Sequence, residues 1–149
     1  MSHKCKLSSS IYLRILLEAG IGEYIQQNTG CYLIQSLASE GHDPNYDAEE
    51  KSLYKQELAK QVLDNCIKLV IDLHGCKRKT PYLIELGTVD DTYKTLNHDE
   101  KLLEIIKTNL ENTLQEYNSQ PVVVNQRFKA FSPNTITHYI NAKTKVKSI

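Results

Sequence analysis

The feature that most constrains the fold is a run of β-branched and other apolar residues at positions 67–73 (IKLVIDL), near the middle of the chain. A short run of this composition is typical of a mostly buried strand. Two shorter strands are predicted at residues 83–86 and 122–124. Segments with apolar residues three and four positions apart separate them, as in amphipathic helices. This alternation predicts an α/β fold with a mostly parallel or mixed sheet flanked by helices.

Helix boundaries are predicted from capping residues. Asp47 with Glu50, and Asn97 with Glu100, have the spacing of capping boxes, and Ser132 before Pro133 predicts the start of a last helix through Tyr139. Residues 11–18 are apolar and fit a helix or a strand, with Gly20 and Gly22 as its end. Asn28 or Thr29 is the predicted cap of a helix that ends before Gly41. The faces predicted to be buried are Leu53, Tyr54, Leu58, Val62 and Leu63 in one helix, Tyr32, Leu33, Leu37 and Ala38 in another, and Leu103, Ile106, Leu110, Leu114 and Tyr117 in a third.

Composition narrows the classes of function. The 149 residues carry 18 Lys and Arg against 18 Asp and Glu, and the net charge of +0 argues against a nucleic-acid or anionic-membrane partner. No apolar run approaches the roughly 20 residues of a membrane span, and no signal peptide is visible. We therefore expect one cytoplasmic domain over residues 1–149, with residues 1–10 frayed.

The four cysteines are Cys5, Cys31, Cys66 and Cys76, and none forms a C-x-x-C pair. A zinc knuckle is therefore not expected. In a reducing cytosol the thiols are predicted to be free, with Cys31 and Cys66 as small core residues.

The segment with most chemical content is Asp72-Leu73-His74-Gly75, at the end of the central strand. Strand alternation places Asp72 and His74 on the same side. A histidine at a strand end can offer a neutral nitrogen to zinc, and metal-bound histidines usually need a carboxylate or carbonyl partner. The alternative is a packed histidine with Asp72 capping a turn, because four residues make a weak motif.

A wider set of segments extends this pattern. Residues 43–58 (DPNYDAEEKSLYKQEL), 69–75 (LVIDLHG), 85–88 (ELGT) and 125–139 (NQRFKAFSPNTITHY) follow one another in that order. Together they resemble the N-formylglutamate amidohydrolase family, which belongs to the zinc-carboxypeptidase-like hydrolases. The resemblance runs from about residue 28 to the C-terminus.

The resemblance implies a zinc-peptidase-like fold and one Zn²⁺ at the strand ends, acting on N-acyl amino acids such as N-formylglutamate or on similar amides. His74 matches a zinc-binding histidine, and Asp72 matches the acidic residue before it in a catalytic role. Arg78 and Arg127 are candidates for binding the substrate carboxylate, although each is equally well read as a solvated surface arginine. Thr88 and Thr137 are expected to make local hydrogen bonds.

The chain also departs from the family pattern. An early histidine followed three residues later by glutamate is expected, but here His3 is followed by Lys6, which has no lone pair for a metal. His3 is thus a candidate second ligand or a frayed terminal residue. The strand that carries the family's catalytic glutamate would begin near residue 146. Two alternatives to an active hydrolase follow: a non-catalytic binding or structural module, or a truncated remnant of such an enzyme.

Overall fold

A computed structural model describes residues 11–15, 19–34, 44–75, 79–115 and 121–149. Helices and strands alternate along most of this part of the chain. The elements are β1 (Ile11–Ile15), α1 (Ala19–Thr29), β2 (Tyr32–Leu33), the 3₁₀ turn η1 (Glu49–Lys51), α2 (Leu53–Asp64), β3 (Leu69–Leu73), β4 (Ile84–Leu86), the 3₁₀ turn η2 (Lys94–Leu96), α3 (Glu100–Gln115), β5 (Val122–Val124), α4 (Ile136–Thr144) and β6 (Lys147–Ser148).

The described strands form two small parallel sheets. The larger has the order β2-β1-β3-β6, and the smaller pairs β4 with β5. Every pairing is parallel, including β1 with β3 in the register Ile11 to Leu69 and β3 with β6 in the register Leu69 to Lys147. The α/β class and the parallel strands predicted from the sequence are therefore confirmed. Parallel strands end at the same edge of a sheet, so the carboxyl ends of β1, β2, β3 and β6 lie on one side.

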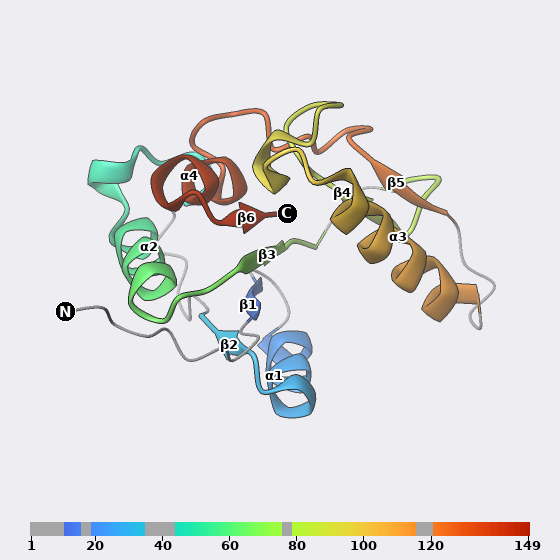
Figure 1. Cartoon of the computed structure of the whole chain (residues 1–149), viewed down its shortest axis with the longest axis horizontal. Coiled ribbons are helices and arrows are strands. Elements are labelled where there is room, and N and C mark those ends of the chain that lie inside the picture. Colours follow the sequence, from blue (N-terminus) through green and yellow to red (C-terminus); the bar gives the residue numbers. More distant parts are fainter. Residues whose placement is uncertain (1–10, 16–18, 35–43, 76–78, 116–120) are drawn as a thin grey trace.

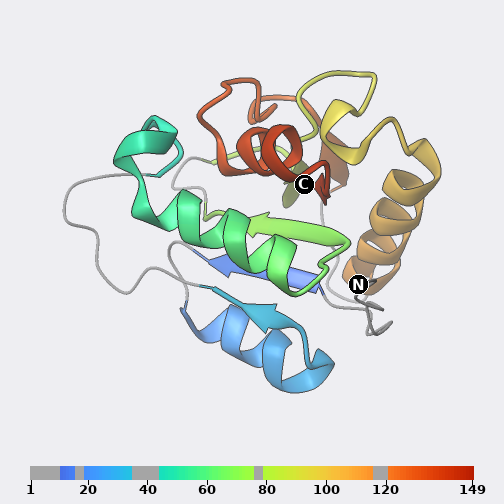
Figure 2. The same ribbon diagram turned by 60° about the vertical axis from the view of Figure 1, so that its left-hand side comes forward.

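Two apolar clusters hold the helices against these sheets. α2 and α4 lie side by side, and α3 lies beside β4 and β5 (Figure 1). Figure 2 shows α2 along the sheet, with α1 below the edge strand β2. The first cluster joins α2, β3 and α4, and the second joins β4, β5, η2 and α3. Their fully buried aliphatic side chains include Leu58, Ile136 and Ile140 in the first cluster, and Leu96 and Leu103 in the second. Each such side chain contributes roughly 1.5–3 kcal/mol by leaving water.

The N-terminal third differs from the prediction. Residues 11–15, for which a helix or a strand was predicted, form a strand. Gly20 and Gly22, which were predicted to end this element, lie inside α1 instead. Asn28 and Thr29, predicted as helix caps, lie in the last turn of α1 and bond back to the carbonyls of Tyr24 and Ile25. The helix ends at Thr29, and Gly30 directly after it adopts φ +67°. Tyr32 and Leu33, predicted to be helical, form β2 instead.

Helix starts were predicted a few residues early. Ser52 caps α2 by accepting the N–H of Lys55, while Glu49–Lys51 forms a 3₁₀ turn. Thr135 caps α4 in the same way, so the prediction of Ser132 was wrong. A side-chain oxygen must reach the second or third amide of the helix, and tertiary packing selects which oxygen does so. Leu53 and Leu63, predicted to be buried, are exposed at the two ends of α2.

The other sequence predictions have mixed outcomes. The strand over residues 122–124 is confirmed, and α3 buries Leu103 with Ile106 and Leu110 partly buried. Cys31 is a buried free thiol, as predicted. Cys66 is disulfide-bonded, so the prediction of a free thiol there was wrong. It adopts φ 54° in the turn that joins α2 to β3. A disulfide requires two cysteines to lie close together in the fold, and their spacing in the sequence does not show this.

Candidate functional site

Asp72 and His74 come together at the carboxyl end of β3, as strand alternation predicts. Nε2 of His74 lies 2.8 Å from Oδ2 of Asp72. The Asp72 side chain is 3% exposed, whereas the His74 side chain is 42% exposed. A carboxylate beneath the surface thus holds an imidazole that solvent or a ligand can reach.

A third residue, Asn45, touches the same imidazole. Its Nδ2 lies 3.2 Å from Nε2 of His74, and its Oδ1 accepts the backbone N–H of Ile136 at the start of α4. Asn45 therefore connects the end of β3 to the N-terminus of α4. Asn45 was not among the predicted site residues, although it stands within residues 43–58, one of the segments that carry the family resemblance.

These contacts assign the histidine tautomer. Nε2 has a carboxylate oxygen at 2.8 Å and an amide nitrogen at 3.2 Å, and one ring nitrogen cannot both donate to the first and accept from the second. The charge-assisted bond to Asp72 is the stronger one, so the proton is assigned to Nε2. In the neutral ring the lone pair is then on Nδ1. That is the state in which histidine binds a metal or accepts a proton.

The candidate carboxylate-binding arginines have different outcomes. Arg78 lies outside the described residues, as does His3. Arg127 follows β5, and its side chain is exposed, with the guanidinium 5.7 Å from the centre of the Phe128 ring. Among the described residues, no hydrogen bond or ion pair joins the Arg127 side chain to Asp72 or His74.

A carboxylate fixes the backbone around Arg127. Oε1 of Glu85 accepts the N–H groups of Arg127 and Phe128 at 2.5 and 2.7 Å, and its Oε2 accepts the hydroxyl of Tyr82. The next residue on β4 is Leu86, followed by Gly87, where a Cβ would lie 2.4 Å from the carbonyl oxygen of Phe128. The E-L-G segment of the sequence thus has a structural role in holding the loop after β5.

A second polar network secures the same two strand ends. Asn125 accepts the N–H of Thr88 and donates to the Thr88 hydroxyl and to the Asp90 carbonyl, each at 2.8 Å. Both Asn125 and Thr88 are buried, so these bonds satisfy polar groups that would otherwise be costly to desolvate. The local hydrogen-bonding role predicted for Thr88 is confirmed. The buried backbone carbonyl of Thr137 accepts the hydroxyl of Ser148.

Asp72 and His74 fit part of the zinc site that the sequence resemblance implies. His74 offers an imidazole nitrogen and Asp72 a buried carboxylate, which suits a histidine ligand with its carboxylate partner. Catalytic zinc sites normally have three protein ligands. Across the residues that the structure describes, no three His, Cys, Asp or Glu side chains gather as a metal site. The described groups therefore supply one part of such a site, and the remaining ligands would have to come from other residues.

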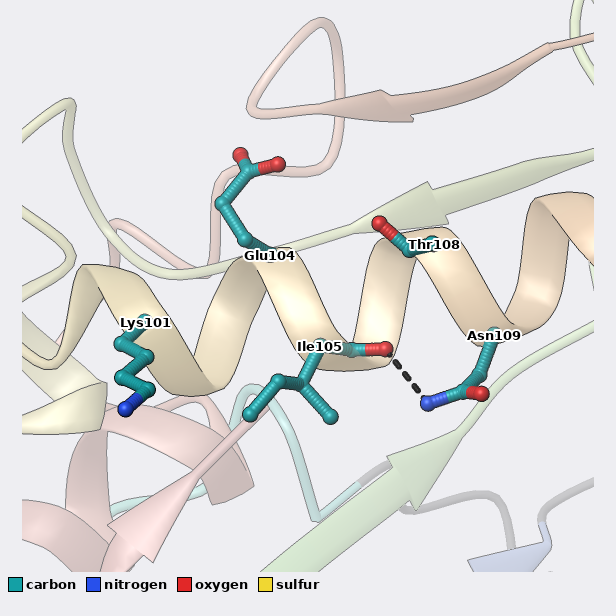
Figure 3. A pocket seen from close by; sticks show the side chains of 5 residues that line it. All are labelled: Lys101, Glu104, Ile105, Thr108 and Asn109. Carbon is teal, nitrogen blue, oxygen red and sulfur yellow. Dashed lines mark hydrogen bonds between the residues drawn. The ribbon is translucent and has the colours of Figure 1, made fainter.

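A shallow hollow of about 300 Å³ lies on α3, lined by Lys101, Glu104, Ile105, Thr108 and Asn109 (Figure 3). It is open to solvent and contains no residue of β3 or its following loop, so it is separate from the His74 site. None of the helices in the described ranges is long and apolar enough to cross a membrane. No protein-family model, curated protein or solved structure matches this chain.

Proposed function

We propose that this chain is a metal-dependent amidohydrolase of N-acyl amino acids or similar small amides, of the N-formylglutamate amidohydrolase type. The observation that carries the proposal is the Asp72–His74 pair at the carboxyl end of a central parallel strand, with an exposed imidazole on a buried carboxylate. Parallel α/β folds bind their ligands at such ends. The pair also lies within residues 69–75 (LVIDLHG), one of the segments that resemble that family.

The residues have distinct roles in this proposal. Asp72 accepts the Nε2 proton of His74, which fixes the ring and leaves the Nδ1 lone pair for Zn²⁺. When bound, zinc would polarise an amide carbonyl and lower the pKa of a water. His3 is the sequence candidate for a second ligand, and Arg78 or Arg127 for the substrate carboxylate. The positive charge of an arginine suits that carboxylate because its planar donors form paired hydrogen bonds.

Metal analysis tests the proposal directly. The full chain, purified without chelator, is expected to carry about one equivalent of zinc, and His74→Ala is expected to lose it. His98→Ala is the matched control, because the His98 side chain is exposed and its Nδ1 bonds the backbone carbonyl of Thr92, away from His74. Wild type is also expected to hydrolyse at least one member of a panel of N-formyl and N-acyl amino acids. A folded wild-type protein that binds no zinc would reject the metal site.

A second candidate function is a non-catalytic binding module that retains the amidohydrolase-like core. It is favoured by the shortage of metal-binding groups around His74 within the described ranges. On this hypothesis no substrate in the panel is hydrolysed at any zinc concentration. Turnover above the metal blank that disappears in His74→Ala would exclude it.

A further inference from the structure

We propose that Lys55 is a positioning residue, whose buried ammonium group clamps the two segments that hold Asn45 against His74. This inference takes the His74 site as the functional one and so rests on the proposed function. Lys55 lies in the first turn of α2 and is 1% exposed. Burying an ammonium is costly unless hydrogen bonds replace its water. A lysine at this depth therefore needs specific acceptors.

Its acceptors lie on segments far apart in the sequence. Nζ of Lys55 donates to the backbone carbonyls of Asp47 and Asn134, each at 2.5 Å. It also lies 5.5 Å from the centre of the Tyr139 ring, close enough for a cation–π contact. The ammonium group thus joins the loop before α2, the loop before α4 and α4 itself. Figure 1 shows α2 and α4 side by side, with these two loops leading into them.

The clamp and the site share the same two segments. Asp47 is two residues after Asn45, and Asn134 is two residues before Ile136, whose N–H binds Oδ1 of Asn45. A second bond between the segments runs from Nδ2 of Asn134 to the carbonyl of Tyr46 at 3.2 Å. With Oδ1 held by α4, Nδ2 of Asn45 lies 3.2 Å from Nε2 of His74. This is a packing contact and not a hydrogen bond, because Nε2 donates its proton to Asp72. Loss of the ammonium leaves two carbonyls without this donor and frees the two loops to separate.

The inference is tested by the nitrogen chemical shifts of the His74 ring, measured by NMR on the metal-free full chain at one fixed pH. Lys55→Met keeps the approximate length of the side chain and removes the charge and its donors. We expect it to shift the His74 signals in the same way as Asn45→Ala, and the double variant to add nothing further. Lys143→Met is the matched control, because it removes a half-exposed cation that pairs with Glu49 nearby. We expect it to leave the His74 signals unchanged.

Three results would overturn the inference: a folded Lys55→Met protein with unchanged His74 signals, shifts that add in the double variant, or an equal shift in Lys143→Met. If Lys55→Met does not fold, Asn134→Ala replaces it. That variant removes only the side-chain bond to Tyr46, and a smaller shift in the same direction is expected, while no shift would count against the clamp. The readout needs neither zinc nor turnover. If the effects of Lys55→Met and Asn45→Ala are coupled but the protein binds no zinc, the proposed hydrolase function is refuted and the positioning role of Lys55 stands.

Discussion

Gly87→Ala should destabilise the loop that carries Arg127. An alanine Cβ at this position would lie 2.4 Å from the carbonyl oxygen of Phe128, and real Cβ atoms essentially never approach closer than 3.0 Å, so the backbone must move by at least 0.6 Å. Hydrogen bonds restrict the movement of the loop after β5. Glu85 holds the N–H groups of Arg127 and Phe128, and the N–H of Val89 donates to the carbonyl of Lys129 at 2.6 Å.

Forcing an extra carbon into such a site costs about 1–3 kcal/mol. For a chain of this size each kcal/mol lowers the melting temperature by roughly 2–4 °C. Thermal unfolding measures the total loss, and amide hydrogen exchange shows where it occurs. We expect the amides of Arg127 and Phe128 to exchange faster in the variant, because the displacement weakens their bonds to Glu85.

Gly30→Ala is the control for a glycine replacement in general. Gly30 has φ +67° and nothing within 4 Å of the added Cβ, so alanine there costs roughly 1–2 kcal/mol of backbone strain without a clash. It should lower the melting temperature without selectively affecting Arg127 and Phe128. If Gly87→Ala has the same melting temperature as wild type and the amides of Arg127 and Phe128 stay protected from exchange, the close approach of Gly87 to the loop after β5 is incorrect.

Three further predictions follow from the packing and electrostatics. Ile140→Ala, in the cluster between α2, β3 and α4, should lower the free energy of unfolding by about 2–5 kcal/mol in urea titrations, whereas Ile105→Ala on the exposed face of α3 should change it by less than about 0.5 kcal/mol. The pKa of the Asp99 carboxyl is lowered from its ordinary 3.8, first by its hydrogen bond with Lys147. The ionised carboxylate therefore stabilises the folded state above pH 3.8, and this stabilisation is lost as the pH falls through the lower pKa of the folded state. Asp99→Asn should therefore be less stable than wild type at neutral pH, and the difference should shrink in acid; a difference that stays constant between pH 7 and pH 2.5 would contradict the linkage. Because Cys66 is disulfide-bonded, thiol titration of the unfolded, unreduced protein should detect at most two of the four cysteines, and four would show that the bond is absent in solution.

The elements that could be predicted correctly are those whose signals lie within a few residues of the sequence. The apolar run before His74 forms β3, the valines at 122–124 form β5, and the three-and-four spacing after Asp99 forms α3. Alternation along one strand was enough to bring Asp72 and His74 together, because residues two apart on a strand share a face. Each of these features depends on neighbours within a few residues.

The features that could not be predicted depend on contacts between segments far apart in the sequence. Asn45 reaches a histidine 29 positions away, and Lys55 reaches a carbonyl 79 positions away. Neither pairing leaves a periodic signal, and a buried lysine reads in a sequence as an ordinary surface charge. The division of the described strands into two sheets and the choice of Ser52 and Thr135 as helix caps also depend on packing. Local spacing specifies which face a side chain occupies, whereas its partner across the fold depends on how the segments pack together.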